Sequence, residues 1–305
     1  MIPRKILIFV VASLSATGNV AAVDCLGDIK TGLGVQGMSR ALDDGGLIAF
    51  AKMNINVDGS GKGYHRLNKG GGALIHLCNA GRVYLPSGES YNPAVSQYCT
   101  GRFMDDLTRI ESAGWNDPSV GAIHWYGIVG EGRAEINHHA VIDVKPIKSA
   151  SGFFVSPTTL FDPSITDRGD QKRYVDPLIV QAAVAPKSIA SFAPMGSYGV
   201  AIDRKKGIAV PFIVGDVGPR IGEGSVALAR AVAGLPKKTD IAYSERYAGA
   251  QDQPNVLWVF FGRRHGVGSY DSSDPEKSNA AAESAYKQWG GKSRLDACLV
   301  RAPRN

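Results

Sequence analysis

The stretch GIAVPFIVGDVGPRIGEGSVALARAVAG, residues 207–234, predicts a strand, a turn and a helix in succession. Its first part, Ile208–Val214, is apolar and β-branched, which is typical of a buried strand that ends at Gly215. The glycines and the proline that follow predict a turn in which the backbone can pass close to itself or to a ligand. Ser225 then predicts the N-cap of a helix over Val226–Ala233.

Two carboxylic acids lie in this stretch, Asp216 at the predicted end of the strand and Glu223 just before the helix. One interpretation is structural: Glu223 complements the helix dipole and Asp216 accepts hydrogen bonds within a turn. The other is catalytic, because a glycosidase needs one carboxyl as general acid and another as general base. Seven residues reach at most about 25 Å when extended. A glycine-rich loop can therefore fold the pair back to the roughly 6.5–9.5 Å that inverting hydrolysis requires.

The segment GDVGPRIGEGSVALARAVAG resembles the signature of the chitosanases of glycoside hydrolase family 75, GD-x-GP followed by a short spacer and IGE-[AG]-S-x-x-LA. Four further segments resemble the family's other blocks in the same order: KMNINVDGSGKGYHRLN (52–68), FVSPTTL (154–160), RYVD (173–176) and NVLWVFFG (255–262). The resemblance covers about residues 48–262, with an insertion between about 84 and 135. Asn56 stands where the family has the first Asp of its DxDG segment, and the spacer before Ile221 is short, which leaves substrate preference less secure than reaction type.

The resemblance implies that Asp216 is the general base on water, that Glu223 is the general acid on the leaving oxygen, and that the anomeric configuration is inverted. It implies no metal and no organic cofactor. It also suggests substrate-binding roles, although Asp58 and Asp176 are equally typical of turns. The residues so suggested are Asp58, Tyr64, His65, Thr158, Thr159, Tyr174 and Asp176. Aromatic residues at 124–126 either pack in the core, which is the preferred interpretation, or stack on sugar rings.

The composition is that of one large globular domain. The chain has 305 residues, of which 44% are apolar and 20% are charged. Its 37 glycines and many short β-branched runs predict an α+β fold dominated by β structure, with a β-barrel core, peripheral helices and long loops. The GDxGP turn is similar to a turn of double-psi β-barrels. We expect a single catalytic domain over 23–305, in which 263–305 form a C-terminal helical extension.

Apolar periodicity and turn residues predict the individual elements. Strands are expected at Ala73–Leu77, Gly121–Val129, Ala140–Val144, Gly152–Val155, Leu178–Ala183, Gly199–Ile202, Ile208–Val214 and Val256–Phe261. Helices are expected at Phe103–Ala113, Val226–Ala233 and Asp274–Gln288.

Residues 1–22 predict a secretory signal peptide, because Arg4 and Lys5 precede a short apolar run and small residues follow. Export to the periplasm or the medium places the four cysteines in an oxidising compartment, where two disulfides are expected. Three pairings exist. We favour Cys78 with Cys99, which closes the inserted loop, and Cys25 with Cys298, which ties the ends together. The cysteine and histidine spacings match no zinc motif.

The net charge bears on the substrate. The formal charge is +6, and removal of Arg4 and Lys5 with the signal peptide lowers it by two to about +4. Chitosan is a polycation, so a basic protein argues mildly for a neutral or acidic glycan such as peptidoglycan. A non-catalytic cell-wall glycan-binding protein is the third hypothesis. The expected partner is a polysaccharide, with no nucleic acid, no membrane insertion after signal cleavage, and a monomeric state.

Overall fold

The computed structural model describes residues 25–35, 37–94 and 96–303. The expected signal peptide, residues 1–22, lies outside this described part. Within it, no helix is both long enough and apolar enough to cross a membrane.

The core is a closed β-barrel of six strands, which confirms a β-dominated α+β fold with a barrel core. The ring is closed because residues 251–260, the last strand around the barrel, pair with residues 47–56, the first. Two neighbouring pairs are parallel and the other four are antiparallel. Around the ring the strands are β3 (Leu47–Asn56), β14 (Glu223–Ser225), β11 (Ala182–Pro186), β13 (Ala209–Gly218), β12 (Tyr198–Asp203) and β15 (Gln251–Phe260).

Alternating residues of the barrel strands face two different apolar cores. On β3, Leu47, Ala49 and Ala51 point inward, together with Phe212 and Trp258. Helix α3 (Val226–Val232) contributes Leu228 and Val232 to this inner core. The predicted N-cap is confirmed, because the Ser225 hydroxyl accepts a hydrogen bond from the Leu228 backbone N–H at 3.1 Å.

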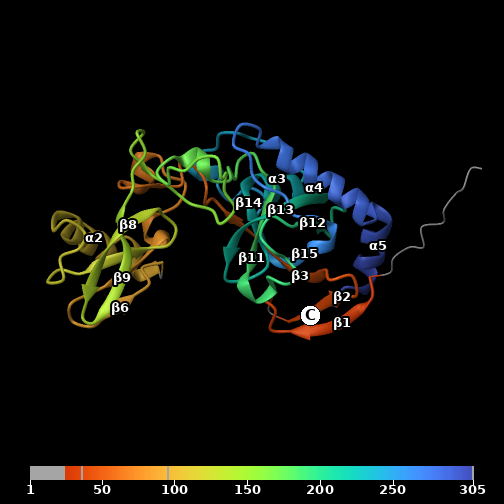
Figure 1. Cartoon of the computed structure of the whole chain (residues 1–305), viewed down its shortest axis with the longest axis horizontal. Coiled ribbons are helices and arrows are strands. Elements are labelled where there is room, and N and C mark those ends of the chain that lie inside the picture. Colours follow the sequence, from red (N-terminus) through yellow and green to blue (C-terminus); the bar gives the residue numbers. More distant parts are fainter. Residues whose placement is uncertain (1–24, 36, 95, 304–305) are drawn as a thin grey trace, which may run out of the picture.

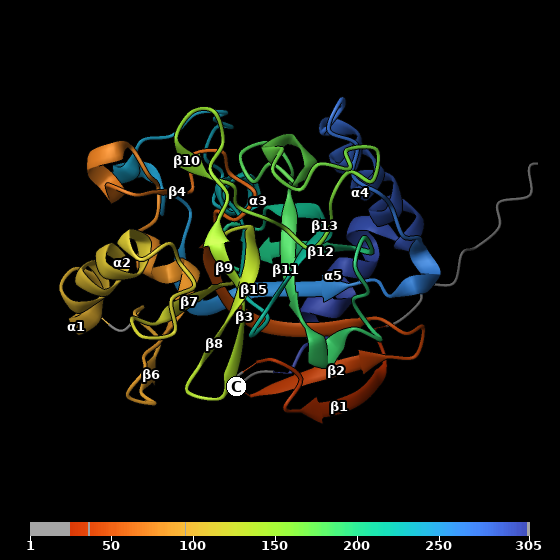
Figure 2. The same ribbon diagram turned by 60° about the vertical axis from the view of Figure 1, so that its left-hand side comes forward.

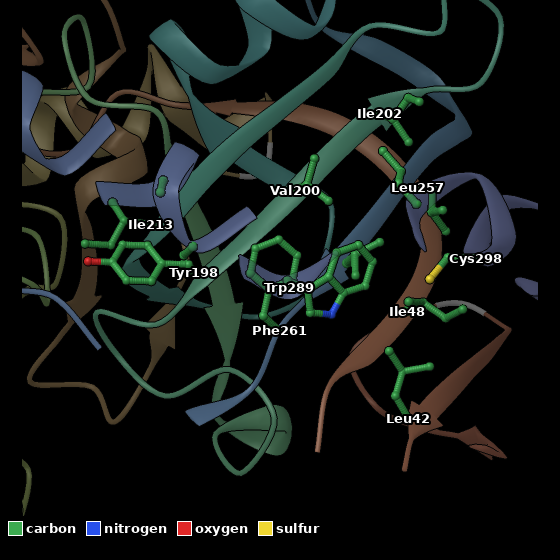
Figure 3. Close-up of a cluster of buried hydrophobic side chains, with 14 of the residues drawn as sticks. Leu42, Ile48, Tyr198, Val200, Ile202, Ile213, Leu257, Phe261, Trp289 and Cys298 are labelled. Carbon is green, nitrogen blue, oxygen red and sulfur yellow. The ribbon is translucent and has the colours of Figure 1, made fainter. Parts of the chain in front are cut away.

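The outer face of the barrel is covered by helices α4 (Glu276–Trp289) and α5 (Gly291–Arg301), on the side away from the lobe described below (Figures 1 and 2). Figure 3 shows this outer core, in which Trp289 lies against Phe261 beside Val200 and Ile48. The two rings stack with centroids 4.7 Å apart. Hairpin β1 (Gly27–Thr31) and β2 (Met38–Leu42) extends the sheet from β3.

Both favoured disulfides are confirmed. Cys25, which precedes β1, is joined to Cys298 of α5, and Cys78 is joined to Cys99. The first bond connects elements at opposite ends of the described chain, and the second lies within the lobe. Oxidised pairs agree with an oxidising compartment.

Residues 64–154 form a lobe beside the barrel, at the left of Figure 1. It has a core of its own, to which Phe103, Leu107, Ile123, Trp125 and Phe154 contribute. The insertion expected at about 84–135 forms only part of this lobe. Its elements are β4 (Tyr64–His65), β5 (Gly81–Tyr84), β6 (Ser90–Tyr91), α1 (Ser96–Cys99), α2 (Arg102–Ser112), β7 (Ala122–Trp125), β8 (Gly130–Ile136), β9 (His139–Pro146) and β10 (Phe153–Phe154).

Several predicted elements are confirmed within two residues at each end, except that the strand expected at Val256–Phe261 begins five residues earlier, at Gln251. They are the strands at Ala140–Val144, Gly152–Val155, Gly199–Ile202 and Val256–Phe261 and the helices at Phe103–Ala113, Val226–Ala233 and Asp274–Gln288. Short 3-10 helices complete the structure at Asn68–Gly71, Leu77–Ala80, Gln171–Arg173, Lys187–Ile189, Tyr243–Glu245 and Arg263–His265.

Other predicted strands are wrong in part or in whole. Ala73–Leu77 is a turn that enters a 3-10 helix, and its apolar residues are buried from a loop rather than from a sheet. The strand expected over Leu178–Ala183 begins only at Ala182, because the Asp176 side chain and carbonyl hold the preceding residues in a turn. The strand expected over Gly121–Val129 ends at Trp125. Strand β13 runs on to Gly218, so Asp216 lies within it rather than after it.

The stacking of α4 on the barrel gives a prediction about stability. Trp289→Ala removes a side chain that is 2% exposed and leaves a cavity against Phe261. We expect a loss of about 3–5 kcal/mol in the free energy of unfolding, measured by urea titration. The matched control is Lys287→Ala on the exposed face of α4, for which a change within about 0.5 kcal/mol is expected. Equal effects of the two substitutions would contradict the packing described.

Candidate active site

A cavity of about 390 Å³ lies where the barrel meets the lobe. Barrel strands and the loops that follow them supply most of its wall, and the rest comes from Tyr126 of the lobe and from residues 157–159, which follow the last strand of the lobe. The residues that line it are Asn56, Asp58, Tyr126, Pro157, Thr158, Thr159, Val184, Asp216, Val217, Gly218, Pro219 and Glu223. Both predicted catalytic carboxylic acids are thus in one cavity.

The pairing of three strands sets the distance between the two carboxyls. Asp216 on β13 and Glu223 on β14 both lie opposite Val184 of β11, one on each side of it. Residues directly opposite one another in a sheet point to the same face, and neighbouring strands lie about 4.7–4.9 Å apart. Two strand spacings place the two Cα atoms about 9.5 Å apart. This gap leaves room for a sugar and a water between the side chains.

A β-bulge turns Asp216 toward the cavity. Ala183 lies opposite Val214, but the next residue, Val184, lies opposite Asp216, so that Gly215 is an extra residue in β13. Val214 points into the inner core. Without the bulge, Asp216 would point the same way, because side chains of one strand share a face at every second residue. The extra residue moves its carboxyl from the barrel interior to the cleft.

Asp216 is held by four hydrogen bonds. Its Oδ1 accepts from the backbone N–H of Thr159 at 2.9 Å, from the Thr159 hydroxyl at 2.7 Å and from the backbone N–H of Val217 at 2.8 Å. Its Oδ2 accepts from the Asn56 amide at 3.4 Å. Burial raises the pKa of Asp216, and these donors oppose that shift by stabilising the carboxylate. The arrangement fixes the orientation of the ionised form.

Glu223 lies in a different environment. Within the described part of the chain, no hydrogen bond reaches its carboxyl from a protein donor. Burial raises the pKa of Glu223, the negative charge of Asp216 raises it further, and the Arg220 guanidinium lowers it. The two carboxyls therefore differ in environment: hydrogen-bond donors stabilise the ionised form of Asp216, and among the described residues no such donor stabilises that of Glu223.

Asp58 is a third carboxyl at the same cavity. It accepts hydrogen bonds from the Tyr64 hydroxyl at 3.0 Å and from the Ser156 hydroxyl at 3.2 Å. Burial, and then the charge of Asp216, raise the pKa of Asp58 to about 8. Burial and the Asp58 charge in turn raise the pKa of Tyr64. Asp58 therefore keeps its proton to higher pH than a free aspartic acid does, whereas the hydrogen-bond donors around Asp216 favour the ionised form of that carboxyl.

The other residues suggested for substrate binding are divided between the cavity and the scaffold. Thr159 lines the cavity and donates to Asp216, whereas the Thr158 hydroxyl at the wall donates to the Leu160 carbonyl and accepts from the Val175 N–H. Tyr64 does not line the cavity, but its hydroxyl donates a hydrogen bond to Asp58. His65, Tyr174 and Asp176 do not line the cavity.

Each of these three residues outside the cavity has a structural contact instead. His65 packs edge-on against Phe153 and accepts from the Leu67 N–H. Tyr174 is buried and donates to the Arg168 carbonyl. Asp176 accepts from the Leu178 N–H in the turn before β11.

Sequence reasoning missed part of the site. Tyr126 is 49% exposed and faces the cavity, whereas the preferred interpretation for this aromatic run, core packing, applies to Trp125, whose indole N–H donates to the Val144 carbonyl. Asn56 appeared in the sequence as a departure from the family pattern, yet it contacts Asp216. Ser156 gave no signal of its own beyond lying in an aligned block.

One group of side chains in the described part of the chain has the spacing for a metal ion. His76 lies with Cys78 and Cys99, with ligand atoms within 4.8 Å of one another. The disulfide engages both sulfurs, and metal binding requires thiolates. This group therefore does not fit a metal site.

No protein-family model matches this chain, and no curated protein matches it. The geometry of the cavity carries the functional argument.

The raised pKa of Asp58 predicts how stability depends on pH. Between pH 3.8 and about 8 the unfolded chain releases a proton that the folded protein keeps. This contribution to stability is fully present below the lower value and is lost as the pH rises through the higher one. Asp58→Asn retains an oxygen for Tyr64 and Ser156 but cannot ionise. Its stability relative to wild type should therefore be greater at pH 8 than at pH 5, as measured by urea midpoints. The same difference at both pH values would contradict the assignment.

Proposed function

We propose that the protein is a glycoside hydrolase that cleaves β-1,4 bonds of an amino-sugar polymer by single displacement, with inversion. The observation that carries this proposal is the placement of Asp216 and Glu223 opposite Val184 on neighbouring strands. The two Cα atoms lie two strand spacings apart, at most about 9.5 Å, so side chains that point to the same face can place their carboxyls at the roughly 6.5–9.5 Å separation of inverting enzymes. Paired carboxyls of different basicity in one cavity have no evident use in a protein that only binds glycans.

The chemistry follows from the two environments. Asp216, oriented by Thr159, accepts a proton from a water while the water oxygen bonds to the anomeric carbon. Glu223 donates its proton to the glycosidic oxygen as the bond from that oxygen to the anomeric carbon breaks. The products are two shorter glycans, one with an inverted reducing end. Exchange with solvent then returns a proton to Glu223 and removes one from Asp216. Tyr126 offers an exposed ring on which a sugar can stack.

Two substrates are candidates. The family resemblance implies chitosan. The net positive charge that remains after removal of Arg4 and Lys5, about +4, and the cationic residues beside the cleft favour instead the glycan strands of peptidoglycan. Either polymer lies outside the cytoplasm, in agreement with the two disulfides and with the predicted signal peptide. The protein would act in the periplasm or the medium.

Neutralising either carboxyl should abolish hydrolysis. With soluble chitosan and with purified cell-wall sacculi as substrates, Asp216→Asn and Glu223→Gln should each lower the release of new reducing ends by about 10²–10⁴-fold. Thermal unfolding of each variant checks that the loss of activity does not result from a loss of folded protein. Glu283→Gln, on the exposed part of α4, is the matched control and should retain full activity.

The stereochemistry of the first product provides a second measurement. Proton NMR of the wild-type reaction should show the α-anomer first, because the base acts on the face opposite the leaving group. Release of the β-anomer first would exclude single displacement. Binding of either polymer without new reducing ends from wild type would favour the glycan-binding hypothesis over the hydrolase.

A further inference from the structure

A second cavity adjoins the first. Its volume is about 600 Å³, and its wall includes Lys52, Asn54, Pro219 and Arg220. Pro219 also lines the cavity that holds Asp216 and Glu223, so the Gly218–Arg220 turn separates the two spaces. The second cavity has no lobe residue in its wall, which consists of barrel residues together with Gly34 and Val35 of the loop between β1 and β2. Because the two cavities share Pro219, a polymer in the first can continue into the second.

One strand forms the floor of both cavities. Phe50, Lys52, Asn54 and Asn56 are alternate residues of β3 and share its outward face. Asn54 lies opposite Glu223 in the register of β3 with β14. From Lys52 to Asn56 the strand rises about 13 Å. The catalytic pair therefore lies partway along a groove that follows β3.

The second cavity is cationic. Lys52 and Arg220 are exposed, and within the described residues neither makes an ion pair or a side-chain hydrogen bond. The Arg204 guanidinium lies 5.7 Å from the centre of the Phe50 ring, which forms part of the cavity wall. None of the wall residues is acidic. The catalytic cavity, by contrast, is lined by Asp58, Asp216 and Glu223.

The positive charge of Arg220, which lines the second cavity, also acts on Glu223 in the first. Its charge lowers the pKa of Glu223 and thus reaches the catalytic acid. An anion bound at Arg220 would lie next to the bond that Glu223 cleaves. An ammonium group at the same place would be repelled by Lys52 and Arg220, at a cost that water and salt reduce but do not abolish.

We propose that this second cavity is a subsite for a sugar unit that carries a carboxylate, bound by Lys52 and Arg220. The proposal rests on the glycoside hydrolase function and names its substrate class: an amino-sugar polymer with carboxylate substituents rather than a polycation. Guanidinium and ammonium groups form charge-assisted hydrogen bonds with carboxylates, and the planar guanidinium can bind both oxygens.

The test compares two soluble polymers with the same backbone, carboxymethyl chitin, which is anionic, and glycol chitin, which is neutral. Affinity electrophoresis measures binding in a Glu223→Gln background, in which cleavage is suppressed. Lys52→Gln and Arg220→Gln should each weaken binding of the anionic polymer about three- to tenfold more than binding of the neutral one. The difference should shrink as salt is raised. Lys287→Gln on α4 removes a charge far from the groove and should leave the ratio unchanged.

Hydrolysis gives an independent readout in the enzyme with Glu223 intact. The ratio of kcat/KM for the anionic polymer to that for the neutral one should fall in both variants, mainly through KM. Equal weakening on the two polymers, or tighter binding of chitosan than of carboxymethyl chitin by wild type, would overturn the subsite. If wild type cleaves no polymer but keeps its charge-dependent binding preference, the hydrolase function fails while the anionic subsite stands.

Discussion

A single extra residue in β13 determines which face of the barrel carries the carboxyl of Asp216. Gly215 displaces the alternation of the strand so that Val214 remains in the inner core and Asp216 emerges on the outer face. A charge inside the barrel would have to be neutralised or paired, because burial without a partner costs several kcal/mol. The position also requires glycine, since an added Cβ would come within 2.9 Å of the Ala182 Cβ. The inner core and the cleft thus depend on the same irregularity.

The cleft concentrates carboxyl groups at a considerable electrostatic cost. Asp58, Asp216 and Glu223 all have raised pKa values, and burial is the largest cause in each case. Such clusters destabilise the folded protein at neutral pH, and proteins keep them mainly where the shifted proton equilibria serve chemistry. Tyr64 is the first residue of the lobe and Ser156 follows its last strand, and both donate to Asp58, which lies just after β3. Asp58 therefore joins the lobe to the barrel at the edge of the cavity.

Local sequence patterns predicted the elements that have one clear face or a clear cap. Ser225, the helix after it and α4 belong to this class, and so do the disulfides, which follow from the spacing of four cysteines. Strand β3 escaped prediction because LIAFAKMNIN is apolar on both faces in its first half and rich in alanine, which gives no period of two. The strand expected at Ala73–Leu77 was wrong because the apolar residues there are buried in a loop of the lobe, and an apolar run alone does not distinguish a buried loop from a buried strand.

Within the candidate site, the sequence neighbours of Asp216 and Glu223 singled them out, but their placement in one cavity could not be predicted. The bulge at Gly215 depends on pairing with β11, which is more than 25 residues earlier in the chain. Tyr126 likewise depends on where β7 ends: Trp125 points into the lobe core and the next residue leaves the strand. Tyr174 and Asp176 belong to a segment that resembles a family block, but both have structural contacts and neither lines the cavity.

The bond between Cys25 and Cys298 has a consequence for survival outside the cell. It spans 273 positions and converts nearly the whole described chain into one covalent ring. A protease that cuts one exposed loop of the lobe or barrel opens this ring without releasing a fragment, so the two new ends stay attached to the same body. Release of a fragment from within this ring requires two cuts, so a chain that has been cut once stays covalently connected.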